Sequence, residues 1–427
     1  MSLSSHGPIS ARRRRRGSAY LVVLGATLIV SSLAFTGLLV SASQRRSASS
    51  AIEAAEARQI ARDAIEIAQL WIHQDPNWRV NRPAGAWATN VPLGPSGGTF
   101  SLEAIDVRDG DMQNRPHDEV VLTATGKKGS ASHTLQVTLE AKPVPIPALS
   151  YSLHTGGELH VLAGKTLTAT GSTVSTNGTI TNQGLINANV SCTLVGIALP
   201  LGVINGTTTL LAPARAFPDS TVIDKYVGLG TQINTSIIDT GILAPGLSSY
   251  GATNPDGIYV VRPTGDFTIK NCRLYGTLVV ICQPGKKVIV DNAVLLEPAT
   301  PDQPSLIIQG NAEFNFDGVN KFKEKDLGLN FNPVEAPVDG DSNTRTNDLF
   351  YSEVRGVVHV KGKVVLKQTS RIRGALICES NASSDAVRVE DSPSIVYTPS
   401  LLTAPPMWYT TSVPMAIKKG TWQQVAN

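Results

Sequence analysis

The hydrophobic and polar positions of this chain change pattern along its length, and the first pattern is a long apolar run. No charged residue occurs in residues 17–44, and most side chains there are apolar. A helix needs about 20 apolar residues to cross a lipid bilayer. The run therefore predicts a membrane-spanning helix over residues 18–43.

The helical pattern continues beyond the apolar run. Residues 47–71 contain no glycine or proline and are rich in alanine, glutamate, arginine and glutamine, which favour helices. Apolar side chains recur there at helical spacing, at Ile60, Ala64, Ile67 and Trp71. Because Pro76 ends the pattern, the sequence predicts one helix over residues 18–75, with its second half packed on a soluble domain.

Alternation of apolar and polar residues follows, after a loop rich in proline and glycine. Three alternating segments predict strands, at residues 99–107, 119–125 and 133–140. The glycines within residues 126–129 predict the turn between the last two strands. We therefore expect a small antiparallel sheet within residues 77–142. Residues 143–147 form a proline-rich linker that cannot continue this sheet.

Short apolar segments, separated by single glycines or small polar turns, fill residues 148–398. Their spacing is too tight for hairpins with well-formed loops and favours a solenoid, in which each coil buries its inward side chains against the next. We predict a parallel β-helix with irregular insertions near residues 194–256 and 317–352, and a β-sandwich is the alternative. Residues 399–427 are expected to cap the last coil.

The predicted fold class is therefore an α+β N-terminal domain, made of the long helix and the small sheet, followed by a mainly-β solenoid. Composition agrees with this prediction, because charged residues make up 17% of the chain and aromatic residues 5%. Such a mixture is typical of many short strands joined by turns and argues against a helical protein.

Charge is concentrated at the N-terminus, where five arginines stand together: Arg12, Arg13, Arg14, Arg15 and Arg16. The net charge of the chain is +3, and +3 minus five leaves −2 for the rest. The basicity therefore belongs to a targeting segment and gives no indication of nucleic-acid binding. Since Arg45 and Arg46 are the only cations on the other flank of the apolar run, we expect a cytoplasmic N-terminus.

This topology predicts a single-pass protein of the bacterial inner membrane, with its C-terminal bulk in the periplasm or outside the cell. The apolar run is longer than the stretch of about 7–15 residues in a cleaved secretory signal. A signal-peptidase site at residues 41–43 is the alternative.

The junction of Arg16, Gly17 and Ser18, followed by the apolar helix, resembles a prepilin leader over residues 1–17. The two-part helix is similar to that of type IV minor pilins and pseudopilins. The resemblance implies cleavage between Gly17 and Ser18 by prepilin peptidase, and assembly with other pilin-like or pseudopilin subunits. It also implies that the helix first packs through Tyr20, Leu21 and Val22.

One position departs from the usual pattern of type IV pilins, which carry glutamate at the fifth mature residue, where this chain has Val22. X-type minor pilins and K-type pseudopilins of type II secretion commonly lack this glutamate, so the resemblance favours these subclasses. The segments that begin at Gly257, Tyr275 and Arg373 are similar to the β-helical heads of some X-type minor-pilin-like proteins.

Catalytic chemistry is not indicated by the sequence. It contains no nucleophile elbow, P-loop, metalloprotease helix or dinucleotide-binding glycine turn. Glycosidases need two or three converging carboxylates, whereas the acidic residues of the predicted β-helix lie singly at turns. Arg371 and Arg373 share one face of a strand, and Arg388 is a candidate third cation from a later coil. We expect a ligand face for polysaccharide here.

The candidates for metal binding are one polar loop and the cysteines. Asp339, Asp341 and Asn343 are spaced like the first ligands of a calcium-binding EF-hand loop, but Thr344 stands where that loop needs glycine and Phe350 where it needs glutamate. A polar surface loop is therefore preferred to a calcium site. The four cysteines lie singly, which argues against a zinc site, at Cys192, Cys272, Cys282 and Cys378. Cys272 and Cys282 both lie in strand-like segments, and two buried free thiols are preferred there to a pair of neighbouring cysteines.

The sequence thus predicts a protein that is not an enzyme and needs no cofactor. Its expected role is that of a minor-pilin-like or pseudopilin-like subunit of a type IV pilus or secretion-type filament, displaying its head for adhesion. An envelope protein that binds polysaccharide from an uncleaved anchor is the alternative, and a glycan-cleaving β-helix enzyme is a third.

Overall fold

The computed structural model describes residues 15–94, 97–193, 197–198 and 202–426. These residues divide into two compact units. The first unit comprises the described residues up to 111, residues 119–140 and the chain from residue 417 onward. The second unit comprises residues 112–118 and 141–416.

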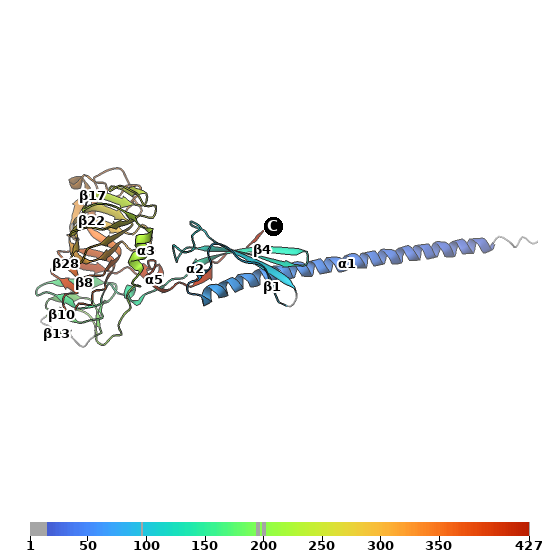
Figure 1. Ribbon diagram of the computed structural model, residues 1–427, viewed down its shortest axis with the longest axis horizontal. Coiled ribbons are helices and arrows are strands. Elements are labelled where there is room, and N and C mark those ends of the chain that lie inside the picture. The colour runs from blue at the N-terminus through green and yellow to red at the C-terminus, as the bar shows by residue number, and fades with distance from the viewer. Residues whose placement is uncertain (1–14, 95–96, 194–196, 199–201, 427) are drawn as a thin grey trace, which may run out of the picture. The chain divides into compact units, whose positions relative to one another are not determined.

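A single unbroken helix, α1 (Arg15–Gln74), opens the first unit (Figure 1). Its 60 residues correspond to about 90 Å at 1.5 Å per residue. An 18-residue window near its start has a mean hydropathy of 2.2, and none of that window is buried. This part of α1 is long and apolar enough to cross a membrane.

The second half of α1 is buried along one face. Small side chains dominate that face, which is formed by Ala57, Ile60, Ala61, Ala64, Ile65, Ala68 and Ile72. They allow the helix backbone to approach strand β3 (Val120–Lys128) very closely. A Cβ atom placed on Gly126 of β3 would lie 2.1 Å from the carbonyl oxygen of Ala57, so the contact requires glycine at this position.

An antiparallel sheet packs against this face of α1. Its central strands are β2 (Gly98–Asp106), β3 and β4 (Ala131–Ala141), and the strand order is β1-β2-β3-β4-β33, with β34 also paired to β4. The remaining strands are β1 (Gly85–Leu93), β33 (Met415–Ile417) and β34 (Gln423–Val425). A short helix, α2 (Trp78–Asn81), joins α1 to β1.

This sheet is larger than the sequence pattern predicted. Strand β1 falls in the expected loop, and it tolerates Pro92 because it is an edge strand that pairs only with β2 among the described strands. Strand β3 runs through the expected turn to Lys128, and the chain turns at Gly129 and Ser130 instead. The strands β33 and β34 come from the far end of the chain.

The second unit is mostly β, and 24 of its described strands form one sheet that is joined largely by parallel pairing. We use the word rung for a group of two or three successive strands that pairs with the corresponding strands of the next group. The first rungs along the chain are built from β6 (Leu153–Thr155), β7 (Leu159–Val161), β8 (Thr166–Thr170), β9 (Val174–Thr176), β10 (Ile180–Asn182), β11 (Leu185–Asn187), β12 (Val190–Cys192), β13 (Ile197–Ala198), β14 (Val203–Ile204) and β15 (Thr208–Thr209).

The later rungs follow a short helix, α3 (Val222–Leu229). They are built from β16 (Thr231–Gln232), β17 (Ile237–Ala244), β18 (Leu247–Ser248), β19 (Ile258–Val261), β20 (Phe267–Tyr275), β21 (Thr277–Ile281), β22 (Lys287–Glu297), β23 (Leu306–Gln309), β24 (Asn311–Asn315), β27 (Glu353–Val360), β28 (Val364–Lys367), β29 (Arg371–Cys378), β30 (Val387–Val389) and β31 (Ser394–Val396). The expected insertion near residues 194–256 therefore contributes several strands to the rungs.

The chain enters this stack of rungs in the middle. Strand β6 pairs with β29 on one side and with β9 on the other, so the first rung lies against the last. From β6 the chain builds outward to β15, and after α3 it resumes at β16, from which the rungs return to β31. The last rung is therefore internal to the stack, and it offers no free end for the predicted C-terminal cap.

The C-terminal segment has two other roles. Residues around α5 (Ser400–Thr403), together with Met407 and Tyr409, pack on the outer face of one wall of the stack and belong to its second hydrophobic core. The imidazole of His359 in this wall contacts the Tyr409 hydroxyl at 2.9 Å and the Glu379 carboxylate at 2.8 Å. The chain then leaves the second unit and supplies β34 to the first.

Two short strands and a 3-10 helix mark the two chain segments that lead into and out of the rungs. The incoming segment contains β5 (Val144–Pro145) and η1 (Pro147–Ser150), and the outgoing one contains β32 (Thr410–Ser412). Strands β5 and β32 pair with each other in antiparallel fashion. The expected linker at residues 143–147 is therefore a paired segment.

Continuous apolar runs in this unit have a structural reason. All four residues of β19 are buried, because alternate side chains point into the inner core of the rungs and into the outer core formed with α3 and the C-terminal segment. The insertion predicted near residues 317–352 is present as a folded excursion with β25 (Lys321–Lys323), α4 (Glu324–Leu327) and β26 (Leu349–Tyr351).

Candidate functional site

Charged side chains meet on one face of the second unit, where β20, β22, β27 and β29 lie next to one another. Within the parallel register, Leu295 pairs with Arg273 on one side and with Glu353 on the other. Arg355 pairs with Arg373. Side chains two residues apart share a face, and neighbouring strands are about 4.8 Å apart. The register therefore brings these charges together.

Glu353 is the centre of one cluster. Its carboxylate is almost fully buried, and it accepts a hydrogen bond of 2.6 Å from Nε of Arg355. Nε of Arg371 lies 3.5 Å from one of its oxygens, and Nη1 of Arg373 lies 3.6 Å from the other. A single carboxylate thus serves three guanidinium groups.

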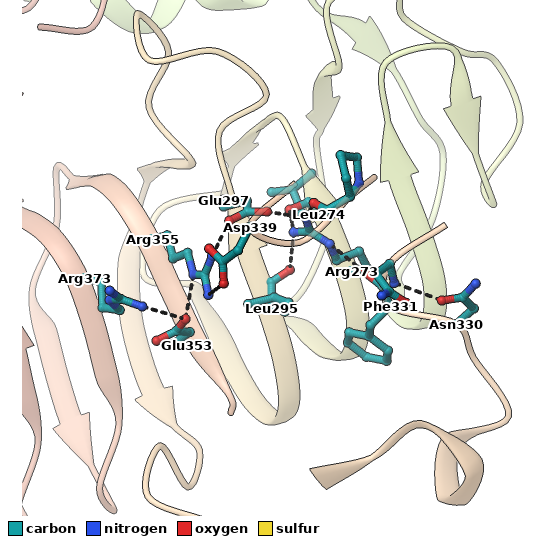
Figure 2. A network of polar contacts seen from close by, with 12 residues as sticks. Arg273, Leu274, Leu295, Glu297, Asn330, Phe331, Asp339, Glu353, Arg355 and Arg373 are labelled. Carbon is teal, nitrogen blue, oxygen red and sulfur yellow. Dashed lines mark hydrogen bonds and ion pairs between the residues drawn. The ribbon is translucent and has the colours of Figure 1, made fainter. Parts of the chain in front are cut away.

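Glu297 is the centre of a second cluster, shown in Figure 2 between Arg273 and Arg355. Nη1 of Arg355 lies 3.0 Å from its Oε2, and Nη2 of Arg273 donates to its Oε1. Arg273 is completely buried, and it also donates to the backbone carbonyls of Phe331 at 3.0 Å, Leu274 at 2.8 Å and Pro337 at 2.9 Å. Its hydrogen-bonding capacity is therefore used inside the protein.

Asp339 supplies a third carboxylate from the insertion. Its side chain is 72% exposed and pairs with Arg355 at 2.7 Å. Arg371 and Arg373 have no carboxylate partner other than Glu353 among the described residues. The arrangement therefore leaves an excess of positive charge at these two arginines.

The pKa shifts favour the charged forms of Asp339 and Arg355 in this network. The hydrogen bond from Arg355 lowers the pKa of the Asp339 carboxyl, and burial offsets this only in part. Burial by itself lowers the pKa of Arg355, but the hydrogen bond to Asp339 and the charges of Glu353 and Glu297 outweigh it and raise the pKa. Burial lowers the pKa of Arg273, and Glu297 counteracts this effect. Fixed charges of this kind suit binding better than proton transfer.

A cavity of about 700 Å³ lies beside the arginines. The rungs contribute Arg355, Arg371 and Arg373 to its lining, and the insertion contributes Lys321, Asn332, Asp339, Asp341, Ser342, Asn343, Asp348 and Tyr351. The guanidinium carbon of Arg371 lies 5.5 Å from the centroid of the Tyr351 ring, and Nζ of Lys321 lies 5.0 Å from it. Glu353 also lines the cavity, which therefore presents cations, carboxylates, amides, hydroxyls and an aromatic face together.

The insertion is held in place by its own core and by a buried carboxylate. Phe331 is fully buried and contacts Phe322 with ring centroids 4.7 Å apart. The Glu324 carboxylate accepts hydrogen bonds from the backbone N–H of Phe331 at 2.6 Å and of Asp348 at 2.9 Å. The insertion is thus an ordered wall of the cavity.

The structure brings together two groups that the sequence suggested separately. Arg371 and Arg373, expected as a ligand face, line the same cavity as Asp339, Asp341 and Asn343, expected as weak metal candidates. Arg388 does not join them. It lies on β30 and pairs with Asp385 at 3.3 Å and with Glu390 at 2.9 Å.

The side-chain oxygens of two of the three metal candidates, Asp339 and Asn343, have other partners in this arrangement. Both carboxylate oxygens of Asp339 accept hydrogen bonds from Arg355. Oδ1 of Asn343 accepts from the backbone N–H of Arg345 at 2.7 Å, and its amide donates to Asp348 at 2.7 Å. Asp341 joins Val338 through backbone hydrogen bonds in a tight turn.

Sequence reasoning missed Arg273, Glu297, Glu353 and Arg355 as members of the site. A signal was present in three segments that each place a large polar residue before glycine, namely Tyr275-Gly276, Arg355-Gly356 and Arg373-Gly374. Alignment of these segments would have predicted their stacking. A Cβ on Gly374 would lie 1.9 Å from the carbonyl oxygen of Gly356, so glycine is needed where the rungs approach most closely.

The residues proposed for processing and membrane insertion lie at the start of α1. Arg12, Arg13 and Arg14 are outside the described residues, and for Arg15, Arg16, Gly17 and Ser18 the structure describes the helical backbone alone. Tyr20, Leu21 and Val22 are each exposed by 70% or more. Arg45 and Arg46 are also exposed.

The four cysteines are free thiols. Burial raises the pKa of Cys378 and of Cys282 to about 11, and it also raises the pKa of Cys192 and Cys272. None of these thiols is therefore activated as a nucleophile.

Among solved structures, the chain is similar to the competence-associated pilin ComZ from Thermus thermophilus. The match has 11% sequence identity and a TM-score of 0.33, and it covers 88% of this chain and 97% of that chain. No protein-family model matches the sequence. No curated protein matches it either.

Proposed function

We propose that this chain is a membrane-anchored, minor-pilin-like or pseudopilin-like subunit of a filament, and that it displays a β-helical head. The observation that carries the proposal is the division of α1 into two halves. One unbroken helix is apolar and exposed over its first half, and buried against an antiparallel sheet over its second. The proposal includes no catalytic step and no cofactor.

The exposed half of α1 needs an apolar environment. Full burial of a large aliphatic or aromatic side chain contributes about 1.5–3 kcal/mol, and Tyr20, Leu21, Val22, Leu28 and Leu33 are all more than 60% exposed. A lipid bilayer provides such an environment before assembly. The same surfaces of neighbouring subunits would provide it in a filament, with Tyr20, Leu21 and Val22 as the first packing surface.

The second unit supports the displayed head. Its strands pair in parallel from rung to rung, and their inward side chains form one continuous core. We take this arrangement as a β-helix, which a subunit could carry without any contribution from its neighbours. Adhesion would then be a property of the head, and assembly a property of α1.

Processing at the N-terminus tests the proposal. Intact-mass measurement and N-terminal sequencing should be carried out on the protein purified from its native membrane, from cells with and without prepilin peptidase. We expect a chain that starts at Ser18 in the first case and retains the arginines at 12–16 in the second.

A pair of glycine variants sharpens this test. Gly17→Ala should retain the leader, because the resemblance places the cleavage next to this residue. Gly25→Ala, where an added methyl group meets nothing within 4 Å, should be processed normally. A wild-type chain that keeps its leader in cells containing the peptidase would contradict the proposal and favour an uncleaved envelope anchor.

A further inference from the structure

We propose that the cavity between the rungs and the insertion binds an acidic glycan, with carboxylate groups of its sugars on Arg371 and Arg373. This binding site goes beyond the proposed function, since neither filament assembly nor display of the head requires it. Its test is also independent of processing, because the site lies entirely within the second unit.

The exposure and the hydrogen bonding of Arg371 and Arg373 distinguish them from an arginine with a purely structural role. Arg273 spends its donors on buried carbonyls and on Glu297. Arg371 and Arg373 remain 29% and 44% exposed and lie 3.5 Å and 3.6 Å from a carboxylate that Arg355 already engages at 2.6 Å. Their remaining donors are therefore accessible to a ligand carboxylate, which a guanidinium group can bind through two parallel hydrogen bonds.

The cations are also held in position before a ligand arrives. Glu353 is anchored by Arg355, and Arg355 is anchored in turn by Glu297 and Asp339 (Figure 2). The parallel register places Arg355 directly beside Arg373. Because the charges and the strands that carry them are fixed, a ligand loses little free energy in ordering the site.

The rest of the lining favours a sugar over a densely charged phosphate polymer. Asn332, Ser342 and Asn343 offer amides and a hydroxyl, and Tyr351 offers an aromatic face. Asp341 and Asp348 can accept hydrogen bonds from the hydroxyl groups of a sugar, which the backbone of single-stranded DNA lacks. The volume of about 700 Å³ falls within the range of about 300–1,000 Å³ that is typical of ligand pockets, so a short segment of a glycan would occupy it.

Calorimetric titration of the full-length protein in detergent micelles tests the inference. The probe is a tetramer of α-1,4-linked galacturonate, and maltotetraose is its neutral analogue. An oligothymidylate with the same net charge as the galacturonate tetramer serves as the phosphate analogue. We expect saturable binding of the galacturonate tetramer, weakened by added salt, and at least about tenfold weaker binding of both analogues.

Variants locate the site. The double variant Arg371→Gln/Arg373→Gln should weaken binding at least about tenfold. Arg388→Gln is the matched control, since this arginine has a similar exposure of 36% but lies outside the cavity. The variant Tyr351→Leu removes the aromatic face of the cavity. It leaves all three guanidinium partners of the Glu353 carboxylate in place. Thermal unfolding should show that each variant is folded.

Three outcomes would overturn the inference. Unchanged affinity in both the double variant and Tyr351→Leu would remove the cavity as the site. An equal loss in Arg388→Gln would indicate nonspecific attraction by surface charge. Equal or tighter binding of the oligothymidylate, lost in the same variants, would assign the cavity to nucleic acid.

Discussion

Buried and half-buried charges in the second unit are satisfied mainly across rungs, between residues far apart in the sequence. Arg273 pairs with Glu297, which is 24 residues away on the next rung. Lys287 and Lys367 contact Glu313 from opposite sides, at 2.7 Å and 2.9 Å. Such pairs depend on register. A change of one charged residue here therefore acts on the stacking of at least two rungs.

Asp317, at the start of the insertion, offers a pH-dependent test of this principle. Burial raises its pKa, but hydrogen bonds from Asn320, the backbone of Val319 and Thr369 outweigh burial and lower the pKa from 3.8 to about 2. Because the folded state holds the carboxylate ionised, the stability it contributes is present above about pH 4 and is lost as the pH falls toward about 2.

We expect Asp317→Asn to lower the thermal unfolding temperature at pH 7 by a few degrees, and the difference from wild type to shrink between about pH 4 and pH 2. Differential scanning calorimetry over this range measures both. Asp341→Asn, at an exposed carboxylate of the same insertion, should leave the temperature unchanged. A deficit that stays constant with pH would show that the charge is not the stabilising feature.

At this scale, the sequence predicted what depends on neighbouring positions. Arg371 and Arg373 could be assigned to one face because they are two residues apart in a strand. Glu353 and Arg355 could not be connected to them, since the connection depends on which strand stacks on which. The pairs Tyr275-Gly276, Arg355-Gly356 and Arg373-Gly374 carry that information, but it is visible only after the rungs have been aligned.

Among the elements, α1 was the most predictable and its buried face the least. The absence of charges from residues 17–44, and of glycine and proline from residues 47–71, defined the helix almost to its ends. Ile67 and Trp71, expected on the packed face, are only half-buried, and alanines occupy its centre. Alanine is both a strong helix former and weakly apolar, so its pattern does not reveal how closely a helix approaches a sheet.

The close approach of α1 to β3 gives a prediction for Gly126. Gly126→Ala should lower the free energy of unfolding of the first unit by about 1–3 kcal/mol, because the added carbon cannot be accommodated beside the backbone of Ala57 and Ala61. Hydrogen exchange of the amides in residues 57–68, which should become faster, measures this effect locally.

Gly228 provides the control. It lies in α3, and a Cβ there meets nothing within 4 Å. Gly228→Ala should therefore leave exchange in residues 57–68 unaltered. Wild-type protection of α1 in the Gly126→Ala protein would mean that the helix and the sheet can separate slightly at little cost.

For the whole molecule, chain order and spatial order differ in a way that no local pattern could predict. The alternating segments were sufficient to predict a sheet in residues 77–142. Strand β34, however, comes from residues 423–425, and it pairs with β4 although the whole second unit separates them in the sequence. Likewise, the C-terminal segment was expected as a cap because the last rung in sequence was assumed to be the last in space. The pairing of β6 with β29 makes that rung internal.

Completion of the first sheet by the C-terminus leads to a further prediction. Removal of residues 417–427 would leave the backbone of β4 without β34 and remove the ion pair of Lys418 with Glu119. We expect lower protection of β4 amides in hydrogen exchange and earlier proteolysis of the first unit. The second unit should be unaffected, so protection of β19 and β21 serves as the internal control. Equal protection of β4 in both proteins would contradict this role for β34.

The position of residues 141–416, between β4 and the C-terminal strands, also has a mechanical consequence. A domain that is added at one end of a chain transmits a pulling force through a single covalent segment. Here a pull on the second unit would divide between two chain segments, one continuing from β4 and the other leading to β34. The antiparallel pairing of β5 with β32 joins these two chain segments before they reach the sheet. Tension would therefore act on β4 and on the C-terminal strands at the same time, and a protease that cuts one of the two segments would leave the second unit attached through the other.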